Sequence, residues 1–261
     1  MVGRAIHVVP GGTAIQAIGL ARLGVASTLV APRANDLAGR VLAEQLRQEG
    51  VPWVGPTAAR TAATAVLSSS VGVAMATAPA DGEPSAGDVA AVGADAVVLS
   101  IGRASLRPPG VRACFVTGQV EVDAGVRPPA STGRGDVLVV NEREALALTE
   151  EPDAERAART LGRDVETAIV TTGTTGAIGV RGDTLVRSPA PDVDVVDATG
   201  AGDLFVSAIV WTTTRALDLE RALAWACLAA GLSVAAPTAL AGARTIDELL
   251  AEGRRRGLTP P

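Results

Sequence analysis

Residues 195–210 read Val-Val-Asp-Ala-Thr-Gly-Ala-Gly-Asp-Leu-Phe-Val-Ser-Ala-Ile-Val, and this stretch decides the expected fold. An apolar run at residues 193–196 predicts a short strand, and the apolar spacing from Leu204 onward predicts a buried helix. The small residues between them let the backbone approach a ligand closely. Because the first turn of a helix has free N–H groups and a partial positive charge, it suits an anion such as phosphate.

Asp203 stands at the predicted start of this helix. A carboxylate would repel a bound anion, so its presence favours a role as the base that takes a proton from an attacking hydroxyl. The alternative is that Asp203 only caps the helix, while Gly200 and Gly202 form a tight turn. The stretch by itself leaves both interpretations open.

Composition excludes several classes of protein. The 261 residues are 48% hydrophobic, which allows one large α/β domain or two small ones. All 23 basic residues are arginine, whereas a Walker A loop needs a lysine. His7 is the only histidine, which disfavours a Ser-His-Asp hydrolase or a histidine metal site. The lack of a Gly-x-Gly-x-x-Gly after an opening strand disfavours a Rossmann-type oxidoreductase.

The expected partner is a small molecule. A net charge of −5 gives no indication of nucleic acid, and no apolar run approaches the ~20 residues of a membrane span. Cys114 and Cys227 lie far apart and form no metal-binding spacing, so we expect a reduced, cytoplasmic protein.

Helical and strand patterns alternate along the chain, which is typical of a doubly wound sheet. Helices are predicted at residues 13–23, 35–50, 88–92, 153–163, 204–215, 220–235 and 246–253. Strands are predicted at residues 5–9, 25–31, 96–100, 111–116, 120–123, 137–140, 168–170 and 177–180. Two further β segments are predicted at residues 61–70 and 71–76, and by themselves they fit an ordinary surface hairpin. No repeat or linker divides the chain.

Two polar clusters follow predicted strands, at the end where open α/β sheets bind ligands. Asn141 and Glu144 come after residues 137–140, and they also fit a capping box, in which Asn141 caps a helix and Glu144 is its partner. Both roles can hold together. Residues 171–176, Thr-Thr-Gly-Thr-Thr-Gly, suit a phosphate-contacting loop, but they could equally form a simple hairpin turn.

The sequence Asp-Ala-Thr-Gly-Ala-Gly-Asp-Leu-Phe at residues 197–205 resembles the C-terminal signature of the ribokinase-like (PfkB) carbohydrate kinases. The resemblance implies a three-layer α/β fold with a doubly wound, mostly parallel sheet and a small β lid. It implies a single kinase domain over residues 1–261, with lid elements at about residues 1–10 and 58–78. The implied activity is ATP-dependent phosphorylation of a hydroxyl on a sugar or nucleoside, with Asp203 as base. Backbone N–H groups of Gly200, Ala201 and Gly202 would stabilise the transferred phosphoryl group.

The resemblance also assigns roles to other residues. A glycine pair, Gly11-Gly12, implies a substrate loop that includes Thr13 and Gln16, although Gln16 replaces the family's asparagine. Asn141 and Glu144 match an Asn-x-x-Glu motif associated with Mg²⁺ and phosphate, and Asp197 and Thr199 stand where some relatives bind a monovalent cation such as K⁺. The implied ATP-binding residues are Asn141, Thr171, Thr172, Gly173, Gly176, Ala226 and Cys227. A homodimer through the lid is a further expectation.

One departure concerns the beginning of the chain. The family has a core strand and a substrate-binding aspartate well before the glycine pair, whereas only ten residues precede Gly11. We expect the genomic sequence upstream of Met1, read in frame, to encode an apolar strand followed by an aspartate. The alternative is a non-catalytic sugar- or nucleotide-binding relative, which a turnover assay distinguishes from a kinase.

Overall fold

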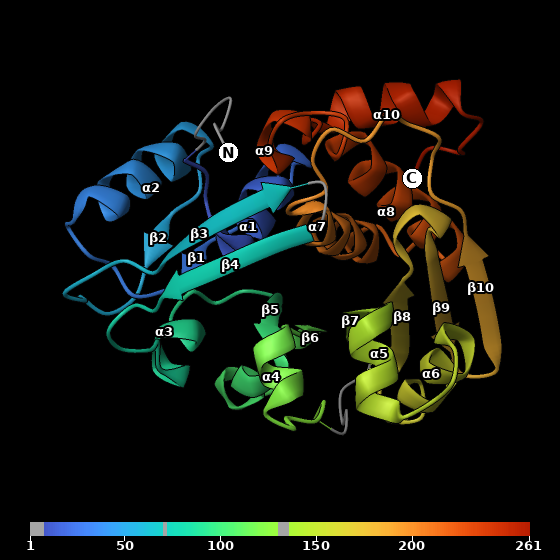
Figure 1. Cartoon of the computed structure of the whole chain (residues 1–261), viewed down its shortest axis with the longest axis horizontal. Helices are drawn as coiled ribbons and strands as arrows, with labels where there is room; N and C mark the ends of the chain where they lie inside the picture. The colour runs from blue at the N-terminus through green and yellow to red at the C-terminus, as the bar shows by residue number, and fades with distance from the viewer. Residues whose placement is uncertain (1–7, 70–71, 130–135) are drawn as a thin grey trace.

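The computed structural model describes residues 8–69, 72–129 and 136–261. Its main sheet is drawn in green to gold in Figure 1. In spatial order the six strands are β10 (Thr184–Ser188), β9 (Ala177–Arg181), β8 (Thr167–Thr171), β7 (Val137–Asn141), β6 (Arg112–Val116) and β5 (Ala96–Ser100). Strands β5 to β8 are parallel, and β9 is antiparallel to both of its neighbours.

Alternate residues of the central strands enter two separate cores, because successive side chains of a strand point to opposite faces. Val137 and Val139 of β7 pack into one core, and Leu138 and Val140 into the other. The first core is covered by α7 (Ala201–Thr214), α8 (Leu219–Ser233) and α10 (Ile246–Arg255), and the second by α4 (Gln119–Asp123), α5 (Glu142–Thr149) and α6 (Ala154–Leu161). The two sets of helices lie on opposite sides of the sheet in Figure 1. The predicted three-layer α/β fold is therefore confirmed.

The N-terminal part of the described chain forms a smaller group beside this sheet. It contains α1 (Gly12–Arg22), β1 (Leu29–Val30), α2 (Leu37–Gln48) and β2 (Trp53–Val54), with α9 (Ala239–Gly242) returning to it from the C-terminal end. In the described part of the chain, strands β1 and β2 pair in parallel and form a sheet of their own. The guanidinium of Arg22 joins three of these elements, because it donates to the carbonyls of Leu240 and Ala243 and pairs with Glu49.

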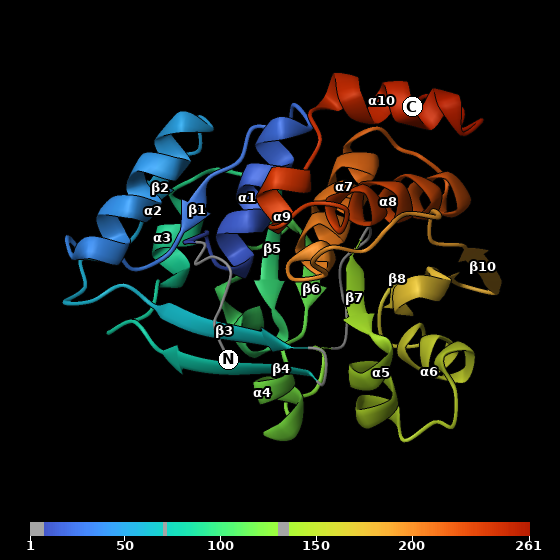
Figure 2. The ribbon, with the colours of Figure 1, turned by 45° about the horizontal axis from the view of Figure 1, so that its top comes forward.

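Strands β3 (Ala63–Ser69) and β4 (Gly72–Ala78) form a separate antiparallel hairpin, as the pattern at residues 61–76 predicts. Figure 2 shows this hairpin apart from the main sheet. The remaining elements are the short helix α3 (Ala86–Ala90) and the 3₁₀ helices η1 (Ile101–Leu106) and η2 (Gly173–Thr175). Within the described residues, no helix has the length and apolarity needed to cross a membrane.

The strand predicted at residues 120–123 is wrong, because this segment is helix α4. The alternation of Val120, Glu121 and Val122 fits either structure over so short a length. Glu121 settles the choice, since its carboxylate accepts the N–H groups of Gly102 and Gly118 at 3.0 and 3.1 Å. A crossover between the parallel strands β6 and β7 also requires an intervening segment that leaves the sheet.

Three other strand predictions fail or shrink. Residues 193–196 form no strand, and Val195 and Val196 are 58% and 61% exposed. The strand predicted at residues 25–31 is reduced to Leu29–Val30. Residues 8–9 are not in a strand, while residues 1–7, which include the rest of that predicted strand and most of the expected N-terminal lid element, lie outside the described chain.

Candidate active site

Helix α7 begins at Ala201, two residues before Asp203, and not at Leu204 as the apolar pattern indicates. Its N-cap, Gly200, has φ +82°, a left-handed conformation that strongly favours glycine. A Cβ at Gly200 would lie 2.7 Å from the Cβ of Ala239 and 3.0 Å from the Cδ1 of Ile15. The signature glycine is therefore needed for both the backbone angle and the close packing of three segments.

The first turn of α7 leaves backbone donors free. The N–H of Ala201 reaches the carbonyl of Ala198 at 3.3 Å, and no side chain caps the helix. Within the described chain, the N–H groups of Gly202 and Asp203 have no hydrogen-bond partner. Free donors at a helix N-terminus can bind an anionic oxygen, as the sequence predicts.

The Asp203 side chain faces the start of α1. The Nε2 of Gln16 donates to Asp203 Oδ1 at 2.8 Å. A Cβ at Gly12 would lie 3.0 Å from Oδ1 and 3.3 Å from Oδ2, so the second residue of the glycine pair makes room for the carboxylate. Gly11 and Thr13 are exposed beside it. The predicted substrate loop and the predicted base are thus brought together from opposite ends of the sequence.

Burial raises the pKa of Asp203 from 3.8 to about 6, and the hydrogen bond from Gln16 partly offsets this rise. Desolvation disfavours the charged form of a carboxylate, whereas donation to the carboxylate favours it. At pH 7 a group with this pKa is about nine-tenths ionised, so it can still accept a proton. A pKa near the working pH is the property that general base catalysis requires.

Asn141 and Glu144 form the predicted capping box at the start of α5. Asn141 Oδ1 accepts the N–H of Glu144, and Glu144 Oε2 accepts the N–H of Asn141, both at 2.9 Å. The Thr117 hydroxyl donates to the same Glu144 oxygen at 2.5 Å. Glu144 is buried, with 6% exposure, while Asn141 is exposed at the carboxyl end of β7. The capping interpretation is confirmed; the magnesium and ATP roles stay predictions.

Residues 171–176 form the turn of an antiparallel hairpin between β8 and β9, so the simpler interpretation of this loop describes its geometry. The N–H of Thr172 donates to the carbonyl of Gly176 at 2.8 Å. Gly176 has φ +107°, and a Cβ there would lie 2.0 Å from the carbonyl oxygen of Ser188. The register pairs Thr171 with Asn141, which places this turn beside the capping box.

The loop before α7 is anchored to the end of α8. The N–H groups of Val196 and Asp197 donate to the carbonyl of Val234 at 2.7 and 3.1 Å. Asp197 Oδ1 accepts the N–H of Thr199 at 2.9 Å. The contact to Val234 replaces the strand ladder that the apolar run predicts, and it holds the signature loop in place.

Ala226 and Cys227 do not line an accessible surface. Ala226 is fully buried and Cys227 is 5% exposed, and the Cys227 Sγ lies 3.7 Å from the carbonyl oxygen of Ser188. Burial also raises the pKa of the Cys227 thiol to about 11, so it stays protonated at neutral pH. A nucleotide could reach these two side chains only if the segment above them moved, and their predicted role in ATP binding is not supported by this arrangement.

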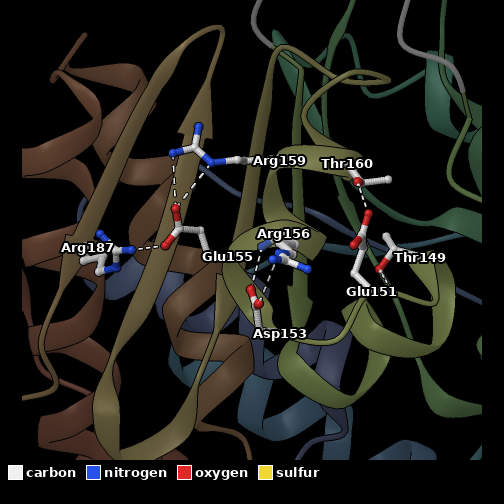
Figure 3. A network of polar contacts seen from close by, with 8 residues as sticks. All are labelled: Thr149, Glu151, Asp153, Glu155, Arg156, Arg159, Thr160 and Arg187. Atoms are coloured by element: carbon white, nitrogen blue, oxygen red, sulfur yellow. Dashed lines mark hydrogen bonds and ion pairs between the residues drawn. The ribbon is translucent and has the colours of Figure 1, made fainter.

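A cavity of about 560 Å³ adjoins the 171–176 loop on the side of α6. Its lining includes Glu142, Asp153, Glu155, Thr172, Thr175 and Arg187. Figure 3 shows Glu155 between Arg159 and Arg187, and Asp153 facing Arg156. Asp203 is not among the residues that line this cavity.

Two residues that the sequence analysis missed contribute to the site. Thr117 follows β6 and holds Glu144, and the signal was available, because polar residues after a strand also identified Asn141. The Ser207 hydroxyl, one turn after Asp203, lies 3.0 Å from the carbonyl oxygens of both Gln16 and Asp203. No local pattern distinguishes Ser207 from an ordinary buried serine.

Comparisons with known proteins agree with this arrangement. Residues 132–246 match the family model described as pfkB family carbohydrate kinase. A 2-dehydro-3-deoxygalactonokinase of Haloferax volcanii is 39% identical over 100 residues, which are 37% of this chain and 31% of that protein. The match to this curated relative therefore spans about a third of its length.

Solved structures show the same fold over most of the chain. An adenosine kinase from Sinorhizobium meliloti superposes with a TM-score of 0.79 at 23% identity and covers 97% of this chain and 85% of its own. Arabidopsis thaliana ribokinase complexed with ribose and ATP gives a TM-score of 0.74 at 24% identity, with 93% and 86% covered. Residues 132–246 are thus similar to the pfkB family of carbohydrate kinases, and the fold of the chain is the ribokinase-like fold.

Proposed function

We propose that this protein transfers the terminal phosphoryl group of ATP to a hydroxyl of a sugar or a sugar-like small molecule, with Asp203 as the base. One observation carries the proposal: a half-buried aspartate with a pKa of about 6 lies in the first turn of a helix whose backbone donors are free. The family match and the 2-dehydro-3-deoxygalactonokinase relative support the same reaction.

The proposed chemistry depends on two features near Asp203: a free carboxylate oxygen and free backbone N–H groups. Within the described residues, Asp203 Oδ2 accepts no hydrogen bond, and it can accept the proton of the acceptor hydroxyl. The free N–H groups of Gly202 and Asp203, together with Gly200 and Ala201, would bind the phosphoryl oxygens as negative charge builds on them. Gly11, Gly12 and Thr13, which lie beside the carboxylate, would contact the sugar.

Mg²⁺ fits this site as an ion that arrives with the nucleotide. The described residues contain no group of three or more His, Cys, Asp or Glu side chains that could hold a metal by themselves. Mg²⁺ usually keeps several waters and binds substrate phosphates with few protein ligands. Glu144 uses only Oε2 in the capping box, so its other oxygen could accept a hydrogen bond from a metal-bound water. Bound Mg²⁺ would neutralise charge on the phosphates.

ATP would extend from the signature loop toward the hairpin turn at residues 171–176. The Asn141 side-chain amide still has its N–H groups free to donate to a phosphate oxygen, because the capping box uses only Oδ1. Thr171, Thr172, Gly173 and Gly176 surround the turn next to it. Asp197 and Thr199 remain our proposed residues for K⁺, and the β3–β4 hairpin our proposed lid and dimer contact in a single kinase domain. A cytoplasmic location also remains a prediction.

A coupled assay of ADP release tests the proposal. Purified protein would be given ATP, Mg²⁺ and a panel of pentoses, hexoses, deoxy sugars, sugar acids and nucleosides. We expect at least one acceptor to raise ADP release above the ATP-only rate and to yield a phosphorylated product by mass spectrometry. Nucleotide binding by calorimetry without turnover on any acceptor would contradict the proposal and favour the non-catalytic relative.

A further inference from the structure

We infer that Gln16 is a positioning residue for Asp203: its side-chain amide fixes Oδ1 and leaves Oδ2 as the oxygen that takes the substrate proton. The inference rests on the proposed function, and it changes the role expected for Gln16 from reading sugar hydroxyls to holding the base.

The hydrogen bond itself is well defined. The Nε2 of Gln16 lies 2.8 Å from Asp203 Oδ1, and Gln16 is only 8% exposed. An ionised carboxylate can only accept hydrogen bonds, so the amide must present its N–H₂ group to Asp203. Gly11, Gly12 and Thr13, in contrast, are exposed at the N-terminal end of α1. A substrate therefore meets the glycine pair and Thr13, while Gln16 lies behind the carboxylate.

The backbone around Gln16 is fixed as firmly as its side chain. The Ser207 hydroxyl, on α7, lies 3.0 Å from the carbonyl oxygen of Gln16. One turn further along α1, Gly19 allows the two helices to touch, because a Cβ there would lie 2.6 Å from Ser207 Oγ and 2.8 Å from Leu204 Cδ2. These contacts fix the distance between Gln16 and Asp203, and they limit the rotation of the Asp203 side chain.

Among the residues that the structure describes, no charged partner competes with Gln16 for Asp203. On α1 the ionisable side chain is Arg22, which is bound to Glu49, and α7 has no other ionisable residue than Asp203. The loop before α7 contributes Asp192, Asp194 and Asp197, and α9 contributes none. Burial, which raises the pKa of Asp203, and Gln16, which lowers it, are the two influences on this group. Loss of the amide should therefore raise the pKa further.

The test replaces Gln16 by methionine, which keeps the length of the side chain and removes the donor. Gln48→Met is the matched control, because Gln48 is an exposed glutamine on α2 whose amide binds Glu44. Two measurements are made on each protein: the pH dependence of kcat and KM for the best acceptor, and the ¹³C NMR titration of the Asp203 carboxyl, assigned with Asp203→Asn.

We expect Gln16→Met to raise the pKa of Asp203 by about one pH unit or more, and to raise the apparent pKa of the acid limb of the kcat/KM profile by the same amount. KM should change little at high pH. Gln16→Glu, which places a second carboxylate beside the first, should raise both further. Gln48→Met should match the wild type.

An unchanged Asp203 pKa in folded Gln16→Met protein would overturn the inference, as would a variant whose defect lies in KM alone. The NMR titration needs no turnover. If no acceptor is found, it still decides whether Gln16 holds Asp203, and only the proposed function fails.

Discussion

Two aspartates of this protein are shielded from water, but they differ in the number of hydrogen-bond donors around them. Asp136, just before β7, is fully buried and receives both arms of the Arg107 guanidinium at 2.6 and 2.9 Å as well as the N–H of Ala113 at 3.1 Å. Asp203, in the first turn of α7, receives one hydrogen bond from a neutral amide. A buried carboxylate with a full set of donors supports the fold, whereas one with a free oxygen is available for chemistry.

The largest expected effect is a loss of activity on substitution of Asp203, the aspartate with a free oxygen. Asp203→Asn should lower kcat by about 10²–10⁴-fold, since general base catalysis typically contributes that much. Asparagine retains the hydrogen-bonding shape of the side chain, so nucleotide binding measured by calorimetry should change little. Turnover within a few-fold of the wild type would show that Asp203 is not the base.

The same substitution at the other aspartate should act on stability. Asp136→Asn leaves the Arg107 charge poorly compensated in a buried position, which typically costs about 3–5 kcal/mol of the free energy of unfolding. Urea unfolding followed by circular dichroism measures this loss. Glu155→Gln, at a largely exposed pair with Arg159, should cost less than about 1 kcal/mol in the same experiment. Equal losses at the two sites would remove the contrast.

The pH dependence of stability sharpens the comparison further. Because the folded-state pKa of Asp203 is raised to about 6 from 3.8, the fold favours the protonated form. The stabilisation from this preference is fully present below the unfolded pKa and is lost as the pH rises through the folded pKa.

It follows that Asp203→Asn, which cannot ionise, should be more stable than the wild type at pH 8, by about 1–2 kcal/mol. The two proteins should have similar stability near pH 3.5, where the wild-type carboxyl is protonated as well. Urea titrations at the two pH values check this. A variant that is less stable than the wild type at pH 8 would show that ionisation of Asp203 costs the fold nothing.

The smallest effect concerns Glu144, which is buried and accepts hydrogen bonds at one carboxylate oxygen. Glu144→Gln keeps one oxygen to accept from Asn141 and Thr117, so the free energy of unfolding should change by less than about 1 kcal/mol. Loss of the charge should raise the Mg²⁺ concentration needed for half-maximal turnover several-fold. A parallel Mg²⁺ titration of both proteins tests this, and identical curves would leave Glu144 with a capping role alone.

Local patterns predicted the parts of the site that depend on neighbouring residues. The succession of an apolar strand, Asn141 and Glu144 predicted both the strand and the cap, because each depends on contacts within four positions. The prediction failed at residues 120–123, where Val120 and Val122 fit a strand but the Glu121 carboxylate accepts the N–H groups of Gly118 and of the more distant Gly102, which favours a helix.

Long-range contacts supplied the rest. Val195 and Val196 have strand-like side chains, yet their segment ends at the carbonyl of Val234 rather than in the sheet. The hydrogen bond between Gln16 and Asp203 joins residues 187 positions apart. No periodicity or spacing can indicate such a pair, so the sequence identified the two residues separately but not the bond between them.

Gly19 has a consequence for how the protein can move. The absence of a side chain at Gly19 lets α1 and α7 interlock at Ser207, and this contact lies one turn from both Gln16 and Asp203. Two helices packed this closely resist sliding past each other. We therefore expect them to travel as one rigid body, with the base and its amide partner in constant register. Any hinge that admits or releases a ligand must then lie outside this helix pair.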